Sequence, residues 1–512
     1  MMRFTTTAKR AGLFLFASAM AMTASAQFLR TSYLQDVPYS LQMNPAQVPS
    51  HGYFSPILGP LSVTLQSNSL GTGDIEDMLD KNGDYYKSSD FLDKLKDENK
   101  LNMNVAWDQI SFGWFNDHNF WSFNTGTRIE MGAVVPKSIF TFMNEMNGAS
   151  LDNETWKKGL NADLAGEKIA MQVYQEVGIG YARKVTDKLT VGGKVKLLLG
   201  VANMDFEIKQ MSVNTPTGID IEKVQNIQES FKNANLDWSK YKNGDYKNDP
   251  SGLLQAVRNE IGAHGKASVA VEATGKASMG GLEWKYNKDK NGNNTYINGA
   301  DFKGFKISGY GLGIDLGATY EVMDNLEVTA AITDLGFISW SKSESKQVDA
   351  KLTRTYDLDQ DENTYNTDGS VKAYGLYDFA KAVSNNEVVN YDMLEMNESE
   401  GESYTTSLYT TLALGGQYTV GEKLVVGALY TGRFAKPKTI SELTLSAAYN
   451  LSAWANIALS YSMIQSSGKS FGLGLKLGPL YVGTDYFFYG KNSQCANVLA
   501  GLSIPLGRGK SF

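Results

Sequence analysis

Cysteine and histidine are scarce in this chain of 512 residues, which contains 1 Cys and 3 His. A single cysteine excludes an intramolecular disulfide, and so few thiol and imidazole groups argue against a Cys/His metal site. Long apolar runs are missing as well. Beyond the N-terminus no run approaches the roughly 18 apolar residues that a membrane-spanning helix needs. A helical membrane protein is therefore excluded, whereas a β-barrel, whose strands alternate apolar and polar residues, is not.

Excess positive charge is also absent, since the formal net charge is -7 at pH 7. Much of the negative charge lies between Ser343 and Glu402, where 14 acidic residues stand against 5 basic ones. Nucleic-acid binding proteins carry the opposite balance, so no nucleic-acid partner is expected.

The first 26 residues have the pattern of a secretory signal peptide. Arg3, Lys9 and Arg10 provide a basic start, an uncharged apolar stretch follows over residues 11–22, and Ala24-Ser25-Ala26 matches a cleavage signal. The sequence therefore predicts export and cleavage before Gln27.

An irregular segment follows the leader and precedes the first strand. Residues 28–60 hold five of the 11 prolines and show no apolar periodicity. Because proline cannot donate to a strand ladder, this stretch is poor strand material. We therefore expect residues 27–59 to form a separate N-terminal piece and residues 60–512 to form the main domain.

The rest of the chain repeats period-two segments, which are clearest in the C-terminal third. Leu443, Leu445 and Ala447 are apolar, whereas Thr444 and Ser446 between them are polar. Side chains on a strand alternate between its faces, so such a segment has one apolar and one polar face. A soluble β-sandwich would show the same alternation and remains an alternative at this point.

The number and spacing of these segments favour a barrel. Short connections fall at every second junction, and long polar, partly helical connections lie between them, near 68–100, 135–169, 212–304 and 343–402. Bacterial outer-membrane barrels have this asymmetry, with long loops outside the cell. The sequence thus predicts an all-β, membrane-spanning antiparallel barrel of about 14 strands, near 60–67, 101–114, 120–134, 170–184, 189–211, 305–322, 326–342, 403–419, 423–434, 440–449, 455–464, 471–478, 480–489 and 495–506.

One segment does not fit this count. Residues 265–286 alternate as a strand does, and they could form an additional strand or a hairpin standing above the barrel. If they formed one further wall position, the even number of strands would be lost.

Aromatic residues gather near the short turns, as expected where acyl chains meet headgroups. A sandwich gives no reason for such a level, so the aromatic positions favour the membrane barrel. The predicted girdle comprises Tyr181, Tyr320, Tyr418, Tyr449, Trp114, Trp121 and Trp454.

Strand alternation also places charged residues on the inner face. They are consistent either with an occluded, internally paired interior or with a polar route for a solute. The lumen-lining candidates are Glu176, Lys194, Lys196, Asp205, Glu207, Lys209, Asp315, Glu327 and Lys476.

The alternation slips twice, near residues 200–203 and near Thr333-Asp334-Leu335-Gly336. Without a slip Asp334 would face lipid, so we expect a β-bulge at each place. A bulged wall strand can form a side opening or can simply curve the barrel.

No enzyme motif stands in a credible context. His51, His118 and His264 have no sequence-level catalytic partner. The acidic run from Asp357 to Asn363 begins like a calcium loop, but Glu362 occupies the position that requires glycine. We predict no catalytic residue, no cofactor and no metal site.

Two stretches carry a family resemblance. Met43-Asn44-Pro45-Ala46 with His51-Gly52-Tyr53-Phe54 resembles the N-terminus of a large uncharacterised family of exported barrels, whose architecture is similar to that of FadL-type long-chain fatty-acid transporters. Residues 309–317 through 335–340 resemble a central hairpin shared by that family and by the barrel subunits of a gliding-associated secretion system. The resemblance implies a 14-stranded barrel with a lumenal N-terminal plug, or hatch, at Asn44, Pro45 and Ala46. It does not imply fatty-acid transport, because no substrate-contacting residues match.

These patterns predict a protein of the outer membrane of a Gram-negative bacterium, in contact with lipid. The favoured function is a non-enzymatic, FadL-like conduit for a hydrophobic or amphipathic small molecule. The alternative is a non-transporting surface anchor whose long loops bind an exported protein or a secretion-machine partner. A surface hydrolase using the acidic loops is a further rival, and a soluble periplasmic sandwich is the alternative fold.

Overall fold

The computed structural model describes most of the chain between Arg30 and Arg508. It covers residues 30–56, 59–74, 88–147, 150–225, 262–288, 292–382, 396–436, 439–464, 470–486 and 494–508, apart from positions 72, 152, 263, 293, 361, 377, 380, 381 and 453. The predicted signal peptide, residues 1–26, lies outside this part of the chain.

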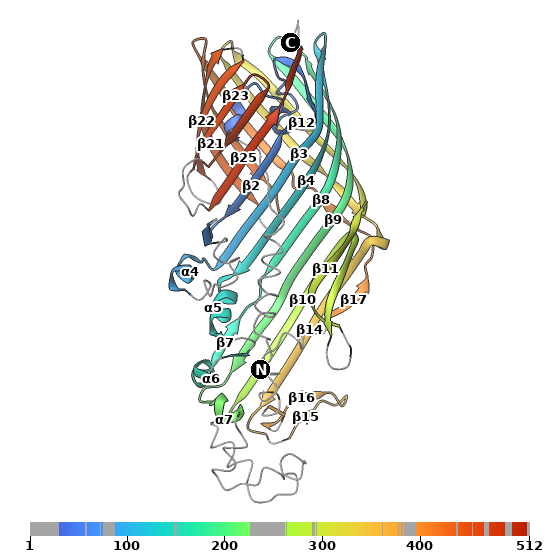
Figure 1. Ribbon diagram of the computed structural model, residues 1–512, viewed down its shortest axis with the longest axis vertical. Coiled ribbons are helices and arrows are strands. Elements are labelled where there is room, and N and C mark those ends of the chain that lie inside the picture. The colour runs from blue at the N-terminus through green and yellow to red at the C-terminus, as the bar shows by residue number, and fades with distance from the viewer. Residues whose placement is uncertain are drawn as a thin grey trace, which may run out of the picture.

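A single sheet of 22 strands closes into an antiparallel barrel with 14 strand positions (Figure 1). The predicted all-β fold and its number of strands are thereby confirmed. In order around the wall, the positions are β1 (His51–Pro56) with β2 (Leu61–Ser67), β3 (Glu98–Asn116), β4 (Asn119–Pro136), β8 (Lys168–Lys184), β9 (Leu189–Thr215), β10 (Lys266–Lys288) with β12 (Gly309–Met323), β13 (Leu326–Trp340) with β14 (Ser345–Asp357), β17 (Met396–Glu400) with β18 (Tyr404–Ser407) and β19 (Thr411–Val420), β20 (Leu424–Arg433), β21 (Ile440–Ser452), β22 (Ala455–Ile464), β23 (Ser470–Leu477), β24 (Leu480–Thr484), and β25 (Cys495–Leu502) with β26 (Ile504–Arg508).

The remaining elements are helices and accessory strands. The helices are η1 (Arg30–Leu34), α2 (Ser40–Met43), α4 (Ser89–Lys94), α5 (Lys137–Glu145), α6 (Asn153–Lys158), α7 (Ile221–Gln225) and η4 (Lys342–Glu344), and the accessory strands are β5 (Met146–Asn147), β6 (Ser150–Leu151), β7 (Leu160–Asp163), β11 (Asn294–Lys306), β15 (Thr364–Tyr365) and β16 (Val371–Ala373). None of the helices in the described ranges is long and apolar enough to cross a membrane.

The barrel closes between its first and last strands. β25 pairs with β2, with Val498 opposite Val63, and β26 pairs with β1. Tight turns join the strands at one end, which we call the short-turn end. Asp117 and Gly478 occupy positive φ angles there, of 52° and 57°, as tight hairpins require. Most helices lie at the other end, which we call the long-loop end (Figure 1).

The segment that did not fit the strand count shares a wall position with β12. β9 pairs with β12 from Leu189 to Gly200, and beyond the bulge it pairs with β10 from Ala202 to Asn214. β10 therefore lengthens the position that β12 occupies and adds no new one, so the number of wall positions stays even. The distal part of β10 leaves the wall as a hairpin with β11. β14, within the 343–402 connection expected as a loop, lengthens its neighbour β13 in the same way.

The wall is much taller on one side than on the other. β9 has 27 residues, whereas β24 has 5. The tall strands extend toward the long-loop end, where they pack against α5, α6 and the segments around β16 (Figure 1). Phe142, Trp156, Tyr356 and Phe379 are buried in this cluster, so the described part of the long-loop end has a hydrophobic core of its own.

Both predicted bulges are confirmed. Val201 is the extra residue on β9 where the register with β8 shifts between Val173 and Tyr174. On β13 the register with β12 shifts opposite Asp315, and Asp334 adopts a positive φ of 58°. The bulge turns the Asp334 carboxylate toward Lys196, which lies 2.7 Å away.

Large apolar side chains cover the outer face near the short-turn end. Val195 is 60% exposed and Tyr310 is 62% exposed, and similar residues follow on every side of the barrel. In the opposite direction, Tyr174, Leu198 and Trp340 point inward and form a buried cluster with Leu408. The wall thus has an apolar outer face and an inner face that mixes polar groups with this cluster.

We predict that Trp340→Ala destabilises the barrel by about 3–5 kcal/mol, because a fully buried ring would leave a cavity. Trp340 is 0% exposed and its Nε1 donates to Thr406 Oγ1 at 2.9 Å. Denaturant unfolding followed by circular dichroism measures the change. Trp454→Ala is the control, since Trp454 is 63% exposed, and equal destabilisation by the two substitutions would contradict the assigned packing.

Candidate functional site

The N-terminal segment, residues 30–50, lies inside the barrel. It contacts β21 and β24 on one side and β3 and β12 on the other. The side chains from Arg30 to Leu34 are all buried. Because these contacts reach opposite parts of the wall, the segment occupies the lumen toward the short-turn end.

The start of this segment is held by buried ionic contacts. The Arg30 guanidinium pairs with Glu442 and lies 3.5 Å from Asp485. The Thr31 backbone amide donates to Asp485 Oδ1 at 2.8 Å, and the Thr31 and Ser460 hydroxyls share a hydrogen bond of 2.6 Å. A buried charge is tolerated only when it is paired, so Arg30 needs both acids.

Further polar contacts follow along the segment. Tyr33 shares a hydrogen bond of 3.1 Å with the Thr329 hydroxyl, and burial raises the pKa of Tyr33 to about 12, so the phenol remains a donor at neutral pH. Gln35 donates to Asn456 Oδ1 at 2.9 Å.

Asn44-Pro45-Ala46 sits against glycines of the wall. Asn44 Nδ2 donates to the Ala318 carbonyl at 3.2 Å, and the Ala46 amide donates back to Asn44 Oδ1 at 2.8 Å. A Cβ at Gly192 would overlap the Pro45 carbonyl, and one at Gly317 would overlap the Asn44 side chain. Glycine at these wall positions therefore makes room for the Asn-Pro-Ala turn.

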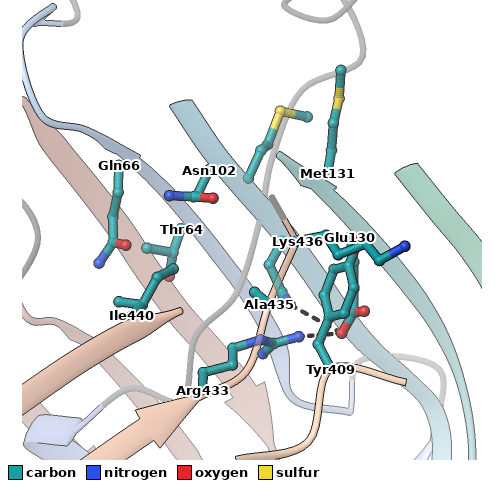
Figure 2. Close-up of a pocket in the computed structure, with 12 residues that line it drawn as sticks. Thr64, Gln66, Asn102, Glu130, Met131, Tyr409, Arg433, Ala435, Lys436 and Ile440 are labelled. Atoms are coloured by element: carbon teal, nitrogen blue, oxygen red, sulfur yellow. Dashed lines mark hydrogen bonds and ion pairs between the residues drawn. The ribbon is translucent and has the colours of Figure 1, made fainter. Parts of the chain in front are cut away.

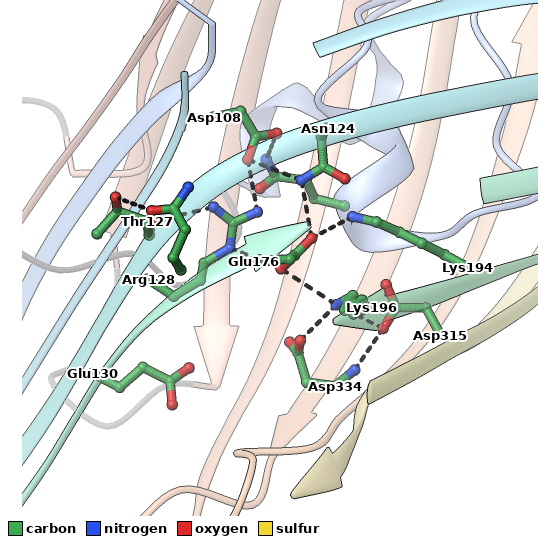
Figure 3. A network of polar contacts seen from close by, with 12 residues as sticks. Asp108, Asn124, Thr127, Arg128, Glu130, Glu176, Lys194, Lys196, Asp315 and Asp334 are labelled. Atoms are coloured by element: carbon green, nitrogen blue, oxygen red, sulfur yellow. Dashed lines mark hydrogen bonds and ion pairs between the residues drawn. The ribbon is translucent and has the colours of Figure 1, made fainter. Parts of the chain in front are cut away.

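On the side of the segment that faces the long-loop end, charged side chains of β3, β4, β8 and β9 form a buried network (Figure 3). Glu176 is its centre. It accepts from Lys194 at 2.7 Å and from Asn124 at 2.9 Å, and Arg128 Nε lies 3.3 Å away in an ion pair. Arg128 also donates to Asp108 at 2.7 Å. Each of these groups is therefore paired away from bulk water.

Lys196 links this network to the bulge on β13. Its ammonium lies 2.8 Å from Asp315 and 2.7 Å from Asp334, and the Asp334 amide donates to Asp315 at 2.8 Å. The bulge is thus stabilised from inside the lumen by a cation between two carboxylates.

An ion pair across the lumen lies between two spaces. Glu130 on β4 pairs with Arg433 at the end of β20 (Figure 2), and both residues line both spaces. We call the space nearer the long-loop end the upper space, although this end is at the bottom of Figure 1. The upper space also contacts Met131 and Ile440. The lower space borders Tyr39 and Gln42 of the N-terminal segment.

The sequence-predicted lumen residues fall into three groups. Glu176, Lys194, Lys196 and Asp315 come together in the buried network. Glu327 and Lys476 lie near the short-turn end, where Glu327 accepts from Gln417 at 2.8 Å and Lys476 lies 3.4 Å from Asp36 of the N-terminal segment.

Asp205, Glu207 and Lys209 do not join the network. Asp205 pairs with Lys436 at 3.0 Å and Glu207 with Lys168 at 2.8 Å, and all of these side chains are solvent-accessible. Past the Val201 bulge, β9 extends toward the long-loop end beyond the ends of the shorter strands in the opposite wall. Its inner face there borders solvent and not a closed lumen.

Sequence reasoning did not select Asp108, Arg128, Glu130, Asp334 or Arg433 as lumen residues. A signal was available for three of them. Arg128 and Glu130 share the even-numbered face of β4 with the buried Asn124, and the slip in alternation indicated that Asp334 turns away from lipid. The pairing of Glu130 with Arg433 depends on the distance across the barrel, which local alternation does not encode.

The predicted aromatic residues lie on the outer face near the short-turn end. Trp121 and Tyr181 pack together with ring centroids 4.8 Å apart, and Tyr181 donates to Asn119 in the adjacent turn at 2.7 Å. The exposed members are Tyr181, Tyr320, Tyr418, Tyr449, Trp114, Trp121 and Trp454.

These features define a class of protein: a closed antiparallel barrel with an apolar outer belt, a charged lumen and an internal N-terminal segment. The model of a family of unknown function, DUF5723, matches residues 45–485, and the chain belongs to this family. The resemblance to an uncharacterised barrel family is thereby confirmed. No curated protein sequence matches the chain.

Several solved structures are similar over nearly the whole chain. The TodX deltaS2S3 mutant monoaromatic hydrocarbon channel has 12% identity and a TM-score of 0.39, covering 95% of this chain and 98% of that one. The Pseudomonas putida toluene transporter TodX has 12% identity and a TM-score of 0.34, with 94% of each chain covered. A Pseudomonas aeruginosa FadL homologue has 10% identity and a TM-score of 0.37, covering 94% of this chain and 98% of that one. The assignment of the barrel fold rests on the strand pairing of this chain.

We predict that Gly192→Ala loosens the N-terminal segment, because the new methyl group would collide with the Pro45 carbonyl. Hydrogen–deuterium exchange of residues 30–50 in the purified full chain should become faster. Gly193→Ala is the matched control, since a Cβ there meets no atom closer than 3.6 Å outside its neighbours. Equal protection in both variants would contradict the close seating of the Asn-Pro-Ala turn.

Proposed function

We propose that this protein is an outer-membrane barrel of a Gram-negative bacterium that conducts an amphipathic solute past an N-terminal plug formed by residues 30–50. The process is non-enzymatic: the solute enters at the long-loop end, passes the Glu130–Arg433 pair and reaches the plug. The specific support comes from the outer belt, the two lumenal spaces and the polar attachment of the plug.

The apolar belt supports a membrane location. Exposed side chains such as Val195, Leu312 and Leu459 would be unfavourable in water over so large an area. The aromatic residues at the short-turn end are suited to the boundary between acyl chains and headgroups. Closure of the sheet also leaves no free backbone edge for lipid to meet.

The order of the two spaces along the lumen is the observation that carries the transport proposal. The upper space is lined by the exposed Lys436, and the lower space ends on Tyr39 and Gln42 of the plug. The Glu130–Arg433 pair lines both spaces, together with Asn104. A solute that displaced this pair would therefore arrive directly at the plug.

The attachment of the plug is suited to reversible displacement. Its contacts with the wall at Thr31, Gln35 and Asn44 are hydrogen bonds, which water can replace. Arg30 is the strongest anchor, because leaving its two acids unpaired would be costly. We therefore propose that passage of a solute breaks the contacts from Thr31 onward, including the Thr31–Ser460 hydrogen bond.

A side exit is supported by the wall near Asp334. The ladder between β13 and its neighbour is regular at Thr333–Thr411 and again at Phe337–Ser407. Between them the regular pairing is lost, and the strands are joined by the Leu408 amide, which donates to the Gly336 carbonyl at 2.9 Å, and by the Thr410 hydroxyl. Leu408 and Tyr409 fill this interruption from the inside. An apolar portion of a solute could leave there without crossing the charged network.

The surface-anchor alternative is favoured by a different observation. The described long-loop end has a core containing Trp156 and Phe379, whose rings pack 5.8 Å apart, and such a folded region could present a binding surface to an exported protein. Conduction requires the plug to move, whereas anchoring does not. The disulfide experiment below, which locks the plug to the wall, separates the two functions.

We predict that Val195→Arg destabilises the barrel in lipid vesicles by about 2–4 kcal/mol, the cost of a cation near the bilayer midplane. Thr353→Arg, at an exposed position of the tall wall beyond the belt, should change stability by less than about 0.5 kcal/mol. Equilibrium unfolding from vesicles measures both. Equal effects of the two substitutions would argue that no bilayer surrounds the belt.

We predict that a disulfide between the plug and the wall blocks transport. Thr31→Cys with Ser460→Cys replaces hydroxyls 2.6 Å apart, close to the roughly 2.05 Å of an S–S bond. In a Cys495→Ser background, a deletion strain carrying this pair should take up radiolabelled oleate, lysophosphatidylethanolamine or dodecylamine no faster than the empty strain, and dithiothreitol should restore uptake.

Thr444→Cys with Ser462→Cys is the matched control for this lock. These hydroxyls lie 2.7 Å apart within the wall, and their disulfide does not touch the plug. Uptake that is unaffected by the plug lock would contradict conduction past the plug. Uptake independent of the whole protein, with loss of a co-purifying exported protein on deletion, would instead support the anchor.

A further inference from the structure

We propose that the upper lumenal space binds the ammonium group of an amphipathic solute, with Glu130 as its anchoring carboxylate. The inference deepens the proposed conduction, on which it rests, by assigning the chemistry of the solute's head. It is carried by an incompletely paired carboxylate, by the distribution of donors around it and by the small space beside it (Figure 2).

Glu130 is buried but only half satisfied. Its side chain is 4% exposed, and Oε1 pairs with Arg433 and accepts from Asn104 at 3.4 Å. Among the described residues, Oε2 has no hydrogen-bond partner. Because Glu130 lines both lumenal spaces, the free oxygen belongs to a side chain that a solute in either space would meet.

The neighbouring cations are already engaged by other acids. Lys194 lies 2.7 Å from Glu176, Lys196 lies 2.7 Å from Asp334, and Arg128 donates to Asp108 at 2.7 Å. Arg433 is the one cation of the network that Glu130 holds, and it also lies over the Tyr409 ring at 5.9 Å. Within the described part of the chain, the network sets five acids against four bases, namely Asp108, Glu130, Glu176, Asp315 and Asp334 against Arg128, Lys194, Lys196 and Arg433.

This imbalance selects a cationic donor. A buried carboxylate oxygen gains most from a charged N–H group, whereas a second carboxylate would add repulsion. The other base of the upper space, Lys436, pairs with Asp205 at 3.0 Å and so offers less to an anionic head. The Tyr409 ring provides an aromatic face that also favours a cation.

The space itself is small. Its volume is about 30 Å³, roughly that of one water molecule, so it fits an ammonium head without an alkyl chain beside it. Met131 follows Glu130 on β4 and packs with Phe91 and Phe140, so its side chain lies on the opposite face of the strand. The alkyl part of the solute would therefore extend from the space toward the long-loop end, past Ile440.

Isothermal titration of the full chain in non-ionic detergent tests the subsite. The probe is n-hexylamine at pH 8, with n-hexanoate and n-hexanol as probes of equal chain length and a protein-free micelle blank. We expect hexylammonium to bind at least about tenfold more tightly than either. Equal or tighter binding of hexanoate would overturn the assignment.

Substitutions locate the binding. Glu130→Gln keeps the shape of the side chain but removes its charge, and it should weaken hexylammonium binding by about tenfold or more. Glu98→Gln makes the same chemical change at an exposed position at the far end of β3 and should have no effect. Arg433→Gln removes the internal competitor and should strengthen binding, a gain that a merely structural role for Glu130 would not produce. Unchanged binding in Glu130→Gln, with circular dichroism showing an intact barrel, would overturn the proposal.

Two further comparisons separate the sources of ammonium and the two proposals. N-acetyllysine methylamide carries the same ammonium without a free alkyl end, and binding as tight as that of hexylammonium would reassign the site to a lysyl side chain and overturn the solute subsite. Hexylammonium binding also does not require transport. Binding that depends on Glu130 would therefore stand even if the plug lock left uptake unchanged, and loss of conduction alone would not remove the subsite.

Discussion

Closure of the sheet is the constraint on which the rest of this structure depends. Pairing of β2 with β25 gives the wall strands partners on both sides around the short-turn end, and so leaves no open backbone edge there. Once the sheet is closed, strand alternation separates an outer apolar face from an inner face that must accommodate polar groups. The belt around Val195 and the charges around Glu176 are two results of this one geometry.

The inner face explains why the lumen is filled. Charges withdrawn from water need partners, and Glu176 obtains three cations from neighbouring strands within 3.9 Å. The N-terminal segment supplies further partners, because Arg30 meets Glu442 and Asp485 from strands on one side of the wall. Gly192 gives the segment room on the other side, so the wall and its contents are adapted to each other.

The sequence predicted the wall better than its interior. Period-two alternation and short turns located the 14 strand positions, and the slips near residue 200 and Asp334 located both bulges, because these features are local. Two strands that share one wall position, β10 and β12, show the same alternation as two neighbouring strands, so the sequence could not distinguish them. Likewise parity predicted an inward Glu176, but the Glu130–Arg433 contact depends on which distant strands face each other. Asp205 shares the inner face yet meets solvent, because the height of the opposite wall is a global property.

A structure of the purified full chain in lipid nanodiscs, determined by cryo-electron microscopy, tests the central claim most directly. The account predicts acyl-chain density around Val195 and Tyr310, headgroup density level with Tyr181 and Trp121, and ordered density for residues 30–50 inside the barrel. Solvent against the belt, or a lumen from which the N-terminal segment is missing, would contradict it.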